Sequence, residues 1–328
     1  MKLYLAGGMS YRELLFGGAI MDLYLAIGGG QWNKYVAPTL KEMGGVKRNE
    51  NLSGSSRGGG WNWFQRAFWP DQENIKAKES ILNMKIHLAG IESRVEELSE
   101  QSKVLRPYIL ESFLMTTPRS VEYLPLYSDY MLDSGAFSML MGNAKKVDLK
   151  TYVDSYIAYI QKYNVQKFFE LDIDPIAGYE EVLKIRKYIA EKVGRSPIPV
   201  WHKSRGMKDF IEMCKRYKYV AIGGYVSGEF TKGEVEKFPL LIKEAHSHGA
   251  KIHGLGFTQL KYLPRFHFDS VDSTAWVSGN RFGAVYKFDG KTMVKYNKPA
   301  GMRVRNKEVA INNFVEWVKF QEYAKTHF

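Results

Sequence analysis

Residues 167–202 read KFFELDIDPIAGYEEVLKIRKYIAEKVGRSPIPVWH, and they contain the pattern from which the fold class can be predicted. It begins with one short apolar run, Lys167–Asp172, and ends with another, Ile198–His202. Between them, Tyr179–Val193 repeats apolar residues three or four positions apart, which is typical of an amphipathic helix. A strand, a helix and a second strand in this order predict a βαβ unit with parallel strands.

The same alternation recurs on both sides of this unit, from Met84 onward. Six more short apolar runs predict strands at Met84–Ala89, Tyr108–Phe113, Tyr130–Asp133, Tyr219–Gly223, Lys251–Gly256 and Ser270–Asp272. Helical periodicity fills three of the intervening segments, Leu149–Tyr163, Lys208–Tyr217 and Lys237–His248. Eight parallel strands separated by helices predict an α/β fold of the (β/α)8 TIM-barrel type over residues 84–328.

The regions that flank the strands have a different character. Residues 1–83 are rich in glycine and aromatic side chains, and we expect an atypical N-terminal extension or insertion outside the barrel. After the last strand, Arg281–Lys307 predicts a basic hairpin that turns at Asp289-Gly290. Glu308–Thr326 then predicts an amphipathic helix that closes the barrel.

The charge balance favours a polyanionic partner. The 328 residues include 47 Lys plus Arg against 35 Asp plus Glu, which gives a net charge of +12. A basic surface that serves solubility alone is the alternative. The single cysteine, Cys214, excludes an internal disulfide and a thiolate-rich zinc site, so we expect neither metal nor cofactor.

The apolar stretch Leu14–Ile27 is interrupted by Asp22 and by paired glycines, so it predicts neither a signal peptide nor a membrane span. We therefore expect a cytoplasmic protein with no membrane partner, in the host cytoplasm if a phage encodes it. The sequence leaves open whether the chain forms a homodimer.

Acidic residues stand at the ends of several predicted strands. In a TIM barrel the reactive groups lie at the carboxyl ends of the strands, so these side chains should face one shared mouth. They are Glu111 at the second strand, Asp133 at the third, Asp172 with Asp174 at the fourth, and Asp272 at the eighth. A carboxylate can attack a sugar carbon while a second acid protonates the leaving group.

Each of these runs also has a purely structural explanation. Asp133 in Leu-Asp-Ser-Gly-Ala-Phe-Ser can cap the next helix, and Gly223-Gly224 can form a tight turn rather than expose backbone to a base. Asp272 in Ser-Val-Asp-Ser-Thr-Ala-Trp can be a cap or a buried ion-pair partner of His202 or His253. Asp269, three residues earlier, is the rival nucleophile, but it falls before or early in the strand.

Taken in order, five short motifs resemble those of the tRNA-guanine transglycosylase superfamily. They are Leu132–Phe137 (LDSGAF), Leu171–Pro175 (LDIDP), Gly223–Glu229 (GGYVSGE), His253–Gly256 (HGLG) and Val271–Ser273 (VDS). The resemblance covers about residues 84–291. It implies that Asp272 is the nucleophile and Asp133 the general acid/base. It also implies a base pocket formed by Asp172, Gly223, Gly224, Ser134, Phe137, His202 and Gly254.

Two departures from the family direct the choice of substrate. Members that act on tRNA have a zinc site of three cysteines and a histidine, which Cys214 alone cannot supply. Trp201 and His202 also stand where the family has a glutamine. The chain is in this respect more similar to the phage-type branch that inserts 7-deazaguanines into DNA.

The function expected from this resemblance is exchange of a guanine in DNA for a free, preQ0-like 7-deazaguanine through a covalent Asp–sugar intermediate. Aromatic side chains such as Phe137, Tyr225 or Trp276 are available to stack on the extruded base. Basic residues around the hairpin are expected to bind phosphates, namely Arg281, Lys287, Lys291, Arg303 and Arg305. The alternatives are a tRNA-guanine transglycosylase that acts on tRNA, a non-catalytic nucleic-acid-binding subunit, and an ordinary barrel glycosidase.

Overall fold

The structure is a computed structural model that describes residues 83–136, 138, 148–277, 283–297 and 305–328. The expected N-terminal extension or insertion, residues 1–83, lies outside the described residues except for Asn83. The same is true of the apolar stretch Leu14–Ile27.

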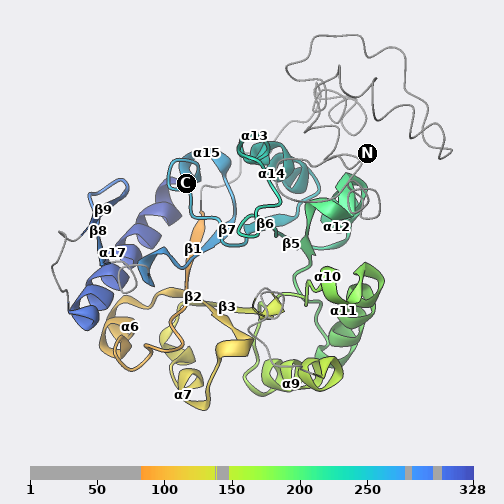
Figure 1. The fold of residues 1–328 in the computed structure, drawn as a ribbon, viewed down its shortest axis with the longest axis horizontal. Helices are drawn as coiled ribbons and strands as arrows, with labels where there is room; N and C mark the ends of the chain where they lie inside the picture. The colour runs from red at the N-terminus through yellow and green to blue at the C-terminus, as the bar shows by residue number, and fades with distance from the viewer. Residues whose placement is uncertain (1–82, 137, 139–147, 278–282, 298–304) are drawn as a thin grey trace, which may run out of the picture. The chain divides into compact units, whose positions relative to one another are not determined.

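Seven strands form one curled parallel sheet with the order β3-β2-β1-β7-β6-β5-β4 (Figure 1). Their bounds are β1 Lys85–Ala89, β2 Tyr108–Ser112, β3 Asp129–Asp133, β4 Val200–Trp201, β5 Tyr219–Ile222, β6 Lys251–Gly254 and β7 Ser270–Ser273. Every pairing within the sheet is parallel, so all the carboxyl ends of the strands lie at one edge. The expectation of an α/β fold with a parallel sheet is therefore confirmed.

The predicted strand Lys167–Asp172 is not a regular strand in the structure. Only isolated parallel bridges occur there, from Leu132 to Phe168 and from Phe169 to Ile198. The next N–H group on this side, that of Val200, donates to the Glu170 carboxylate (2.8 Å) instead of a backbone carbonyl, and the chain turns into a helix at Asp174, so the regular pairing stops after a few residues. The next strand is also shorter than predicted. Ile198–His202 was expected, and β4 contains only Val200–Trp201.

Helices connect the strands and cover the outer side of the sheet. The longer ones are α6 Ser99–Leu105, α9 Leu149–Lys162, α11 Tyr179–Val193, α12 Gly206–Arg216 and α14 Phe238–Ser247. Single-turn helices are α7 Pro118–Val121, α10 Asp174–Ala177, α13 Lys232–Val235 and α15 Leu263–Phe266. Short 3₁₀ turns are η2 Phe113–Met115, η3 Leu124–Leu126, η4 Lys203–Arg205 and η5 Ala275–Val277. Four of these helices match the predicted amphipathic segments to within two residues.

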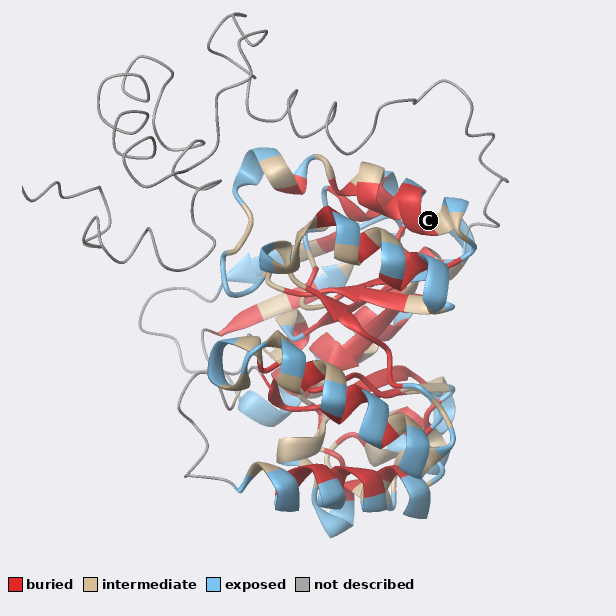
Figure 2. Ribbon diagram, turned by 90° about the vertical axis from the view of Figure 1, so that its right-hand side faces the viewer, coloured by how far each residue is buried: buried red, intermediate tan, exposed pale blue. Residues whose placement is uncertain are grey.

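Apolar side chains cover both faces of the sheet, and its strands are buried, whereas the surrounding helices expose their outer surfaces (Figure 2). The inner face contributes a cluster that includes Ala89, Leu110, Met131, Phe169 and Val200. A second cluster lies between the outer face and helices α9 and α11. Each fully buried aliphatic or aromatic side chain stabilises the fold by roughly 1.5–3 kcal/mol, so these layers fix the strand ends firmly.

The region after β7 is a two-stranded hairpin followed by a long helix, as the sequence predicts. The hairpin pairs β8 Ala284–Phe288 with β9 Met293–Asn297 in antiparallel register, and the helix is α17 Asn306–His327. At the turn, the Asp289 carboxylate accepts hydrogen bonds from the N–H groups of Lys291 (2.9 Å) and Thr292 (2.8 Å).

Helix α17 covers β1 and β2 and is held there by one buried side chain. The Gln321 amide donates to the carbonyls of Ile86 (2.7 Å) and Tyr108 (2.8 Å), and its oxygen accepts from the Tyr108 N–H group (3.3 Å). Within the described ranges, no helix combines the length and the apolar character needed to cross a bilayer.

Candidate active site

Three carboxyl groups meet where the carboxyl ends of the strands converge. Asp133 ends β3, and Asp272 lies near the end of β7. Asp172 follows Phe168 and Phe169, which form the isolated bridges between β3 and β4. Burial, together with the negative charges of Asp172 and Asp272, raises the pKa of Asp133 to about 7. The parallel pairing of the strands places at one edge three of the acids that the sequence singles out.

Asp133 lies in a tight turn that its own sequence explains. The Gly135 N–H group donates to the Asp133 carboxylate at 2.9 Å, and Gly135 has φ +82°, a conformation that disfavours side chains. A Cβ atom at Gly135 would also come within 2.8 Å of Leu114 and of the Tyr152 hydroxyl. Ser134 is buried, with its carbonyl accepting from Tyr152 at 2.6 Å. Phe137 lies outside the described residues.

Asp272 is anchored through one of its two oxygens. Its Oδ1 accepts from the Gly256 N–H group at 2.6 Å and contacts His253 Nε2 at 3.3 Å. Gly256 has φ +64°, so the turn after β6 aims its N–H group at the carboxylate. In the described part of the chain no hydrogen bond reaches Oδ2, and the side chain keeps 10% of its surface exposed. The sequence-based alternative of a contact with His253 is thus present, and it leaves the second oxygen free.

Asp269 lies at the other end of the same strand. It directly precedes β7, and its carboxylate accepts from the Ile252 N–H group at 2.8 Å and pairs with His246 at 2.8 Å. This location separates the rival nucleophile from the converging strand ends.

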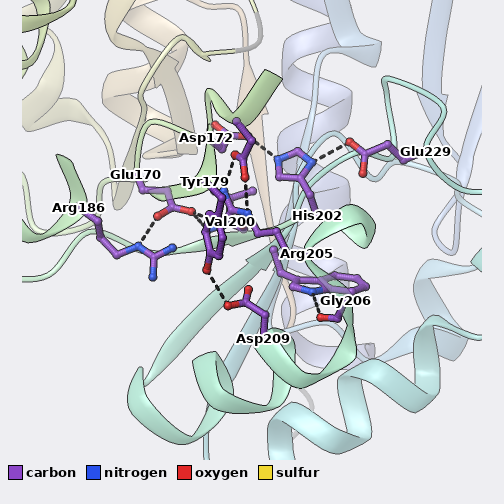
Figure 3. A network of polar contacts seen from close by, with 12 residues as sticks. Glu170, Asp172, Tyr179, Arg186, Val200, His202, Arg205, Gly206, Asp209 and Glu229 are labelled. Carbon is purple, nitrogen blue, oxygen red and sulfur yellow. Dashed lines mark hydrogen bonds and ion pairs between the residues drawn. The ribbon is translucent and has the colours of Figure 1, made fainter. Parts of the chain in front are cut away.

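A histidine links two further carboxylates on the β4–β5 side. His202 Nε2 lies 2.9 Å from the Asp172 carboxylate, and its Nδ1 lies 2.7 Å from Glu229 (Figure 3). Burial lowers the pKa of His202, but the hydrogen bonds with both acids outweigh that effect and raise it to about 10. His202 is therefore an imidazolium at neutral pH, with both ring nitrogens engaged by protein.

The paired glycines make room for this row of side chains. A Cβ atom at Gly223 would come within 2.9 Å of the His202 ring, and one at Gly224 would overlap the Glu229 carboxylate. Gly224 also has φ +78°, and its carbonyl accepts from the Glu229 N–H group at 3.0 Å. Gly254 lies in β6, where an added Cβ would meet Phe257 at 2.9 Å, on the side facing the helices.

Behind Asp172, a buried ionic network fixes the irregular segment to β4 (Figure 3). Glu170 is fully buried and pairs with Arg186 and with Arg205 (2.9 Å), while it accepts from the Val200 N–H group at 2.8 Å. Arg205 also makes a bidentate contact with Asp174, at 2.8 Å and 2.6 Å. These contacts stabilise the loop that carries Asp172 although it lacks regular strand pairing.

Two sequence-based expectations about the mouth are wrong. Glu111 faces away from it, because side chains alternate along β2 and the adjacent Leu110 occupies the inner face. Burial and the Glu92 charge raise the pKa of Glu111 to about 8, and Tyr130 donates to it at 3.2 Å. Trp276 is fully buried and donates to the Ala89 carbonyl at 2.8 Å, so it has no free face for a base.

The basic residues of the hairpin lie at two different ends of the fold. The two ends of helix α17 show which end is which. Its N-terminal part contacts the chain after β7, because the Asn313 side chain donates to the Trp276 carbonyl at 3.2 Å. At its end, the Phe328 carbonyl accepts from Met84, just before β1. Arg305, directly before α17, is therefore on the side of the mouth, whereas the turn containing Lys291 points toward the opposite end (Figure 1). Lys287 and Lys291 are exposed, and Arg281 and Arg303 lie outside the described residues.

Sequence reasoning missed Glu229 as an individual candidate. This residue belongs to a motif that the sequence singles out, but only the fold shows that it reaches His202. Histidine and acid at the ends of adjacent strands are the signal that could have found this contact, whereas the contact of Asp272 with His253 was one of the alternatives from the sequence. Among the described residues, no three His, Cys, Asp or Glu side chains gather in a way that would hold a metal ion.

Comparison with known proteins adds no assignment. A scan against protein-family models finds no match to this sequence, and a search among curated proteins finds none. The functional argument therefore depends on the site itself.

Proposed function

We propose that this protein is a transglycosylase that exchanges guanine in DNA for a 7-deazaguanine, with Asp272 as nucleophile and Asp133 as general acid/base. The observation that carries the proposal is the convergence of one anchored carboxylate and one carboxyl with a raised pKa at the same strand ends. Environments that separate the behaviour of two nearby acids are typical of an acid and a nucleophile that act on one bond.

The proposal includes a closed (β/α)8 barrel. In this arrangement the segment around Phe168 and Phe169 is the strand between β3 and β4. Four backbone hydrogen bonds support it, two with Leu132 on one side and two with Ile198 on the other, at 2.8–3.0 Å. A closed ring places Asp133, Asp172 and Asp272 around one mouth, as catalysis by barrel enzymes requires.

The reaction then proceeds in two displacements at the sugar C1′. Oδ2 of Asp272 bonds to C1′ as the bond from C1′ to the guanine N9 breaks, and Asp133 gives its proton to the departing base. The incoming 7-deazaguanine loses its N9 proton to Asp133 while N9 displaces the carboxylate from C1′. Each step consumes one bond to C1′ and forms one, and Asp133 ends in its initial protonation state.

Asp172 is the residue best placed to recognise the base. One of its oxygens is held by His202, and no hydrogen bond from the described residues reaches the other. A carboxylate oxygen accepts from the N–H donors on the Watson–Crick edge of guanine, an edge that 7-deazaguanines share. In this proposal His202 fixes the orientation of Asp172 rather than contacting the base itself.

The test is exchange of labelled guanine into matched DNA and tRNA substrates. We expect exchange into DNA, and we expect Asp272→Asn to reduce it by about 10³-fold or more, because the nucleophile is removed. Quenched reactions of the wild-type protein should contain a covalent adduct that maps to Asp272.

Asp269→Asn is the matched control, because it changes an aspartate of the same strand outside the mouth and should exchange guanine at the wild-type rate. Exchange into tRNA alone would overturn the choice of DNA and favour the tRNA enzyme. Binding of nucleic acid without any exchange would instead favour the non-catalytic subunit.

A further inference from the structure

A chain of hydrogen bonds leads from the interior of the sheet to Asp272. The Tyr219 hydroxyl contacts the Ser270 hydroxyl, which contacts His253 Nδ1. His253 Nε2 then contacts Asp272 Oδ1 at 3.3 Å. His253 is fully buried and Ser270 nearly so, with exposed fractions of 0% and 1%. In the site as described above, His253 is only a contact of Asp272, and Ser270 and Tyr219 have no part.

One assignment of donors and acceptors satisfies every member of this chain. Burial raises the pKa of the Tyr219 phenol, so it remains a donor, and in the described part of the chain Ser270 is its only hydrogen-bond partner. In this assignment the Ser270 hydroxyl accepts that hydrogen and gives its own to His253 Nδ1. His253 Nε2 then carries the hydrogen that is aimed at the Asp272 carboxylate, which only accepts.

The surroundings of His253 keep its ring in one orientation. It packs against Phe169 with ring centroids 5.1 Å apart and against the edge of His87 at 6.2 Å. Burial lowers the pKa of His87, so this neighbour adds no positive charge at neutral pH. A donor whose ring is held by its packing therefore stands next to Asp272.

We infer that His253, held by Ser270 and Tyr219, is a positioning residue that orients Asp272 for attack on C1′. Together with the Gly256 N–H group it occupies Oδ1, so Oδ2 is the oxygen that forms the bond to the sugar. His253 transfers no proton, because Oδ1 of the sugar ester still accepts the same hydrogen bond. This inference depends on the proposed function.

The contact can be tested by removing and then restoring the donor. In His253→Leu we expect the rate of covalent adduct formation in a single turnover to fall by about 10²-fold, because the nucleophile is misplaced. KM for the nucleic acid should stay unchanged, since His253 touches no substrate. His253→Gln places an amide N–H group near Nε2 and should recover at least about tenfold of the lost rate, roughly the contribution of one hydrogen bond.

His246→Leu is the matched control, because it removes the other histidine–aspartate pair of β7 outside the mouth and should form the adduct at the wild-type rate. Thermal melting measures how much of each variant is folded. Failure of His253→Gln to exceed His253→Leu, or loss of rate only in proportion to loss of folded protein, would overturn the inference. A wild-type protein that forms no adduct overturns the proposed function and this inference together. A His253→Leu variant with wild-type kinetics overturns the inference alone.

Discussion

The two sides of the mouth hold their aspartates by different chemistry. On the β6–β7 side, Asp272 contacts a backbone N–H group and a histidine that ends a chain of hydroxyl groups. On the β4–β5 side, Asp172 contacts a histidine that carries positive charge and is shared with Glu229. A backbone N–H group orients a carboxylate while it leaves the negative charge in place, whereas an imidazolium compensates that charge. In the proposed function this difference suits Asp272 for attack and Asp172 for recognition.

We expect the greatest loss of rate when Asp133 is changed, the third acid of the site, which lies between these two sides. Because Asp133 has a pKa of about 7, it carries its proton below that pH and loses it above. The rate of guanine release should therefore fall as the pH rises through about 7, and Asp133→Asn should lower the rate by about 10²–10⁴-fold and abolish this dependence. Single-turnover rates between pH 5 and pH 9 measure both effects. A wild-type rate that rises through this range would contradict the assignment.

A smaller effect is expected from removing the positive charge of His202, which contacts Asp172 and Glu229. His202 has a higher pKa folded than unfolded, so its contribution to stability is complete below about pH 6.5 and disappears as the pH rises to about 10. His202→Gln should destabilise the protein by about 2 kcal/mol at pH 6 and make little difference at pH 10. Urea unfolding at both values measures this.

The same variant separates the two sides of the mouth kinetically. His202→Gln should raise KM for the free base by about tenfold with a smaller change in kcat, the opposite of the pattern expected for His253. Glu229→Gln is the companion variant and should act in the same direction. Equal losses in kcat for His202 and His253 variants would show that the two sides do not differ in role.

The smallest effect concerns the exposed basic residues. Arg305 lies on the side of the mouth, where its only described ion pair is with Glu308 at 2.9 Å, whereas Lys291 lies at the turn of the hairpin. Arg305→Ala should weaken DNA binding a few-fold and reduce the salt dependence by about one phosphate contact, and Lys291→Ala should do neither. Titrations at several salt concentrations compare them. A stronger effect at Lys291 would move the nucleic acid to the opposite end of the hairpin.

The parts of the fold that the sequence predicts well are those that a repeating pattern determines. Apolar periodicity located the strands from Met84 to Ser273 and the helices between them, because each element buries one face. The exception is Lys167–Asp172, where apolar residues are present but the Val200 N–H group of the neighbouring segment donates to the Glu170 side chain and does not continue the backbone pairing. Local composition does not contain that information, since it depends on what lies opposite.

The candidate site likewise contains residues that a local pattern predicts and contacts that depend on distant parts of the chain. Asp133, Asp172 and Asp272 were predictable, because acids at the carboxyl ends of parallel strands converge. The contact of Asp272 with His253, 19 residues away, was one of the alternatives from the sequence. The contact of His202 with Glu229 was not predicted, because 27 residues separate the two side chains. Glu111 was placed wrongly because it is one position from the end of β2, and that single residue reverses the face to which it points.

The hydrogen bonds that join Gln321 of α17 to β1 and β2 affect how the chain folds during its synthesis. Gln321 and Ile86 are 235 residues apart, so the first strand and its covering helix leave the ribosome at very different times. At a translation rate of about 5–20 residues per second, β1 waits some tens of seconds before this partner exists. During that interval β1 and β2 lack their covering helix, so the nascent α/β fold completes its core only once residue 321 is available.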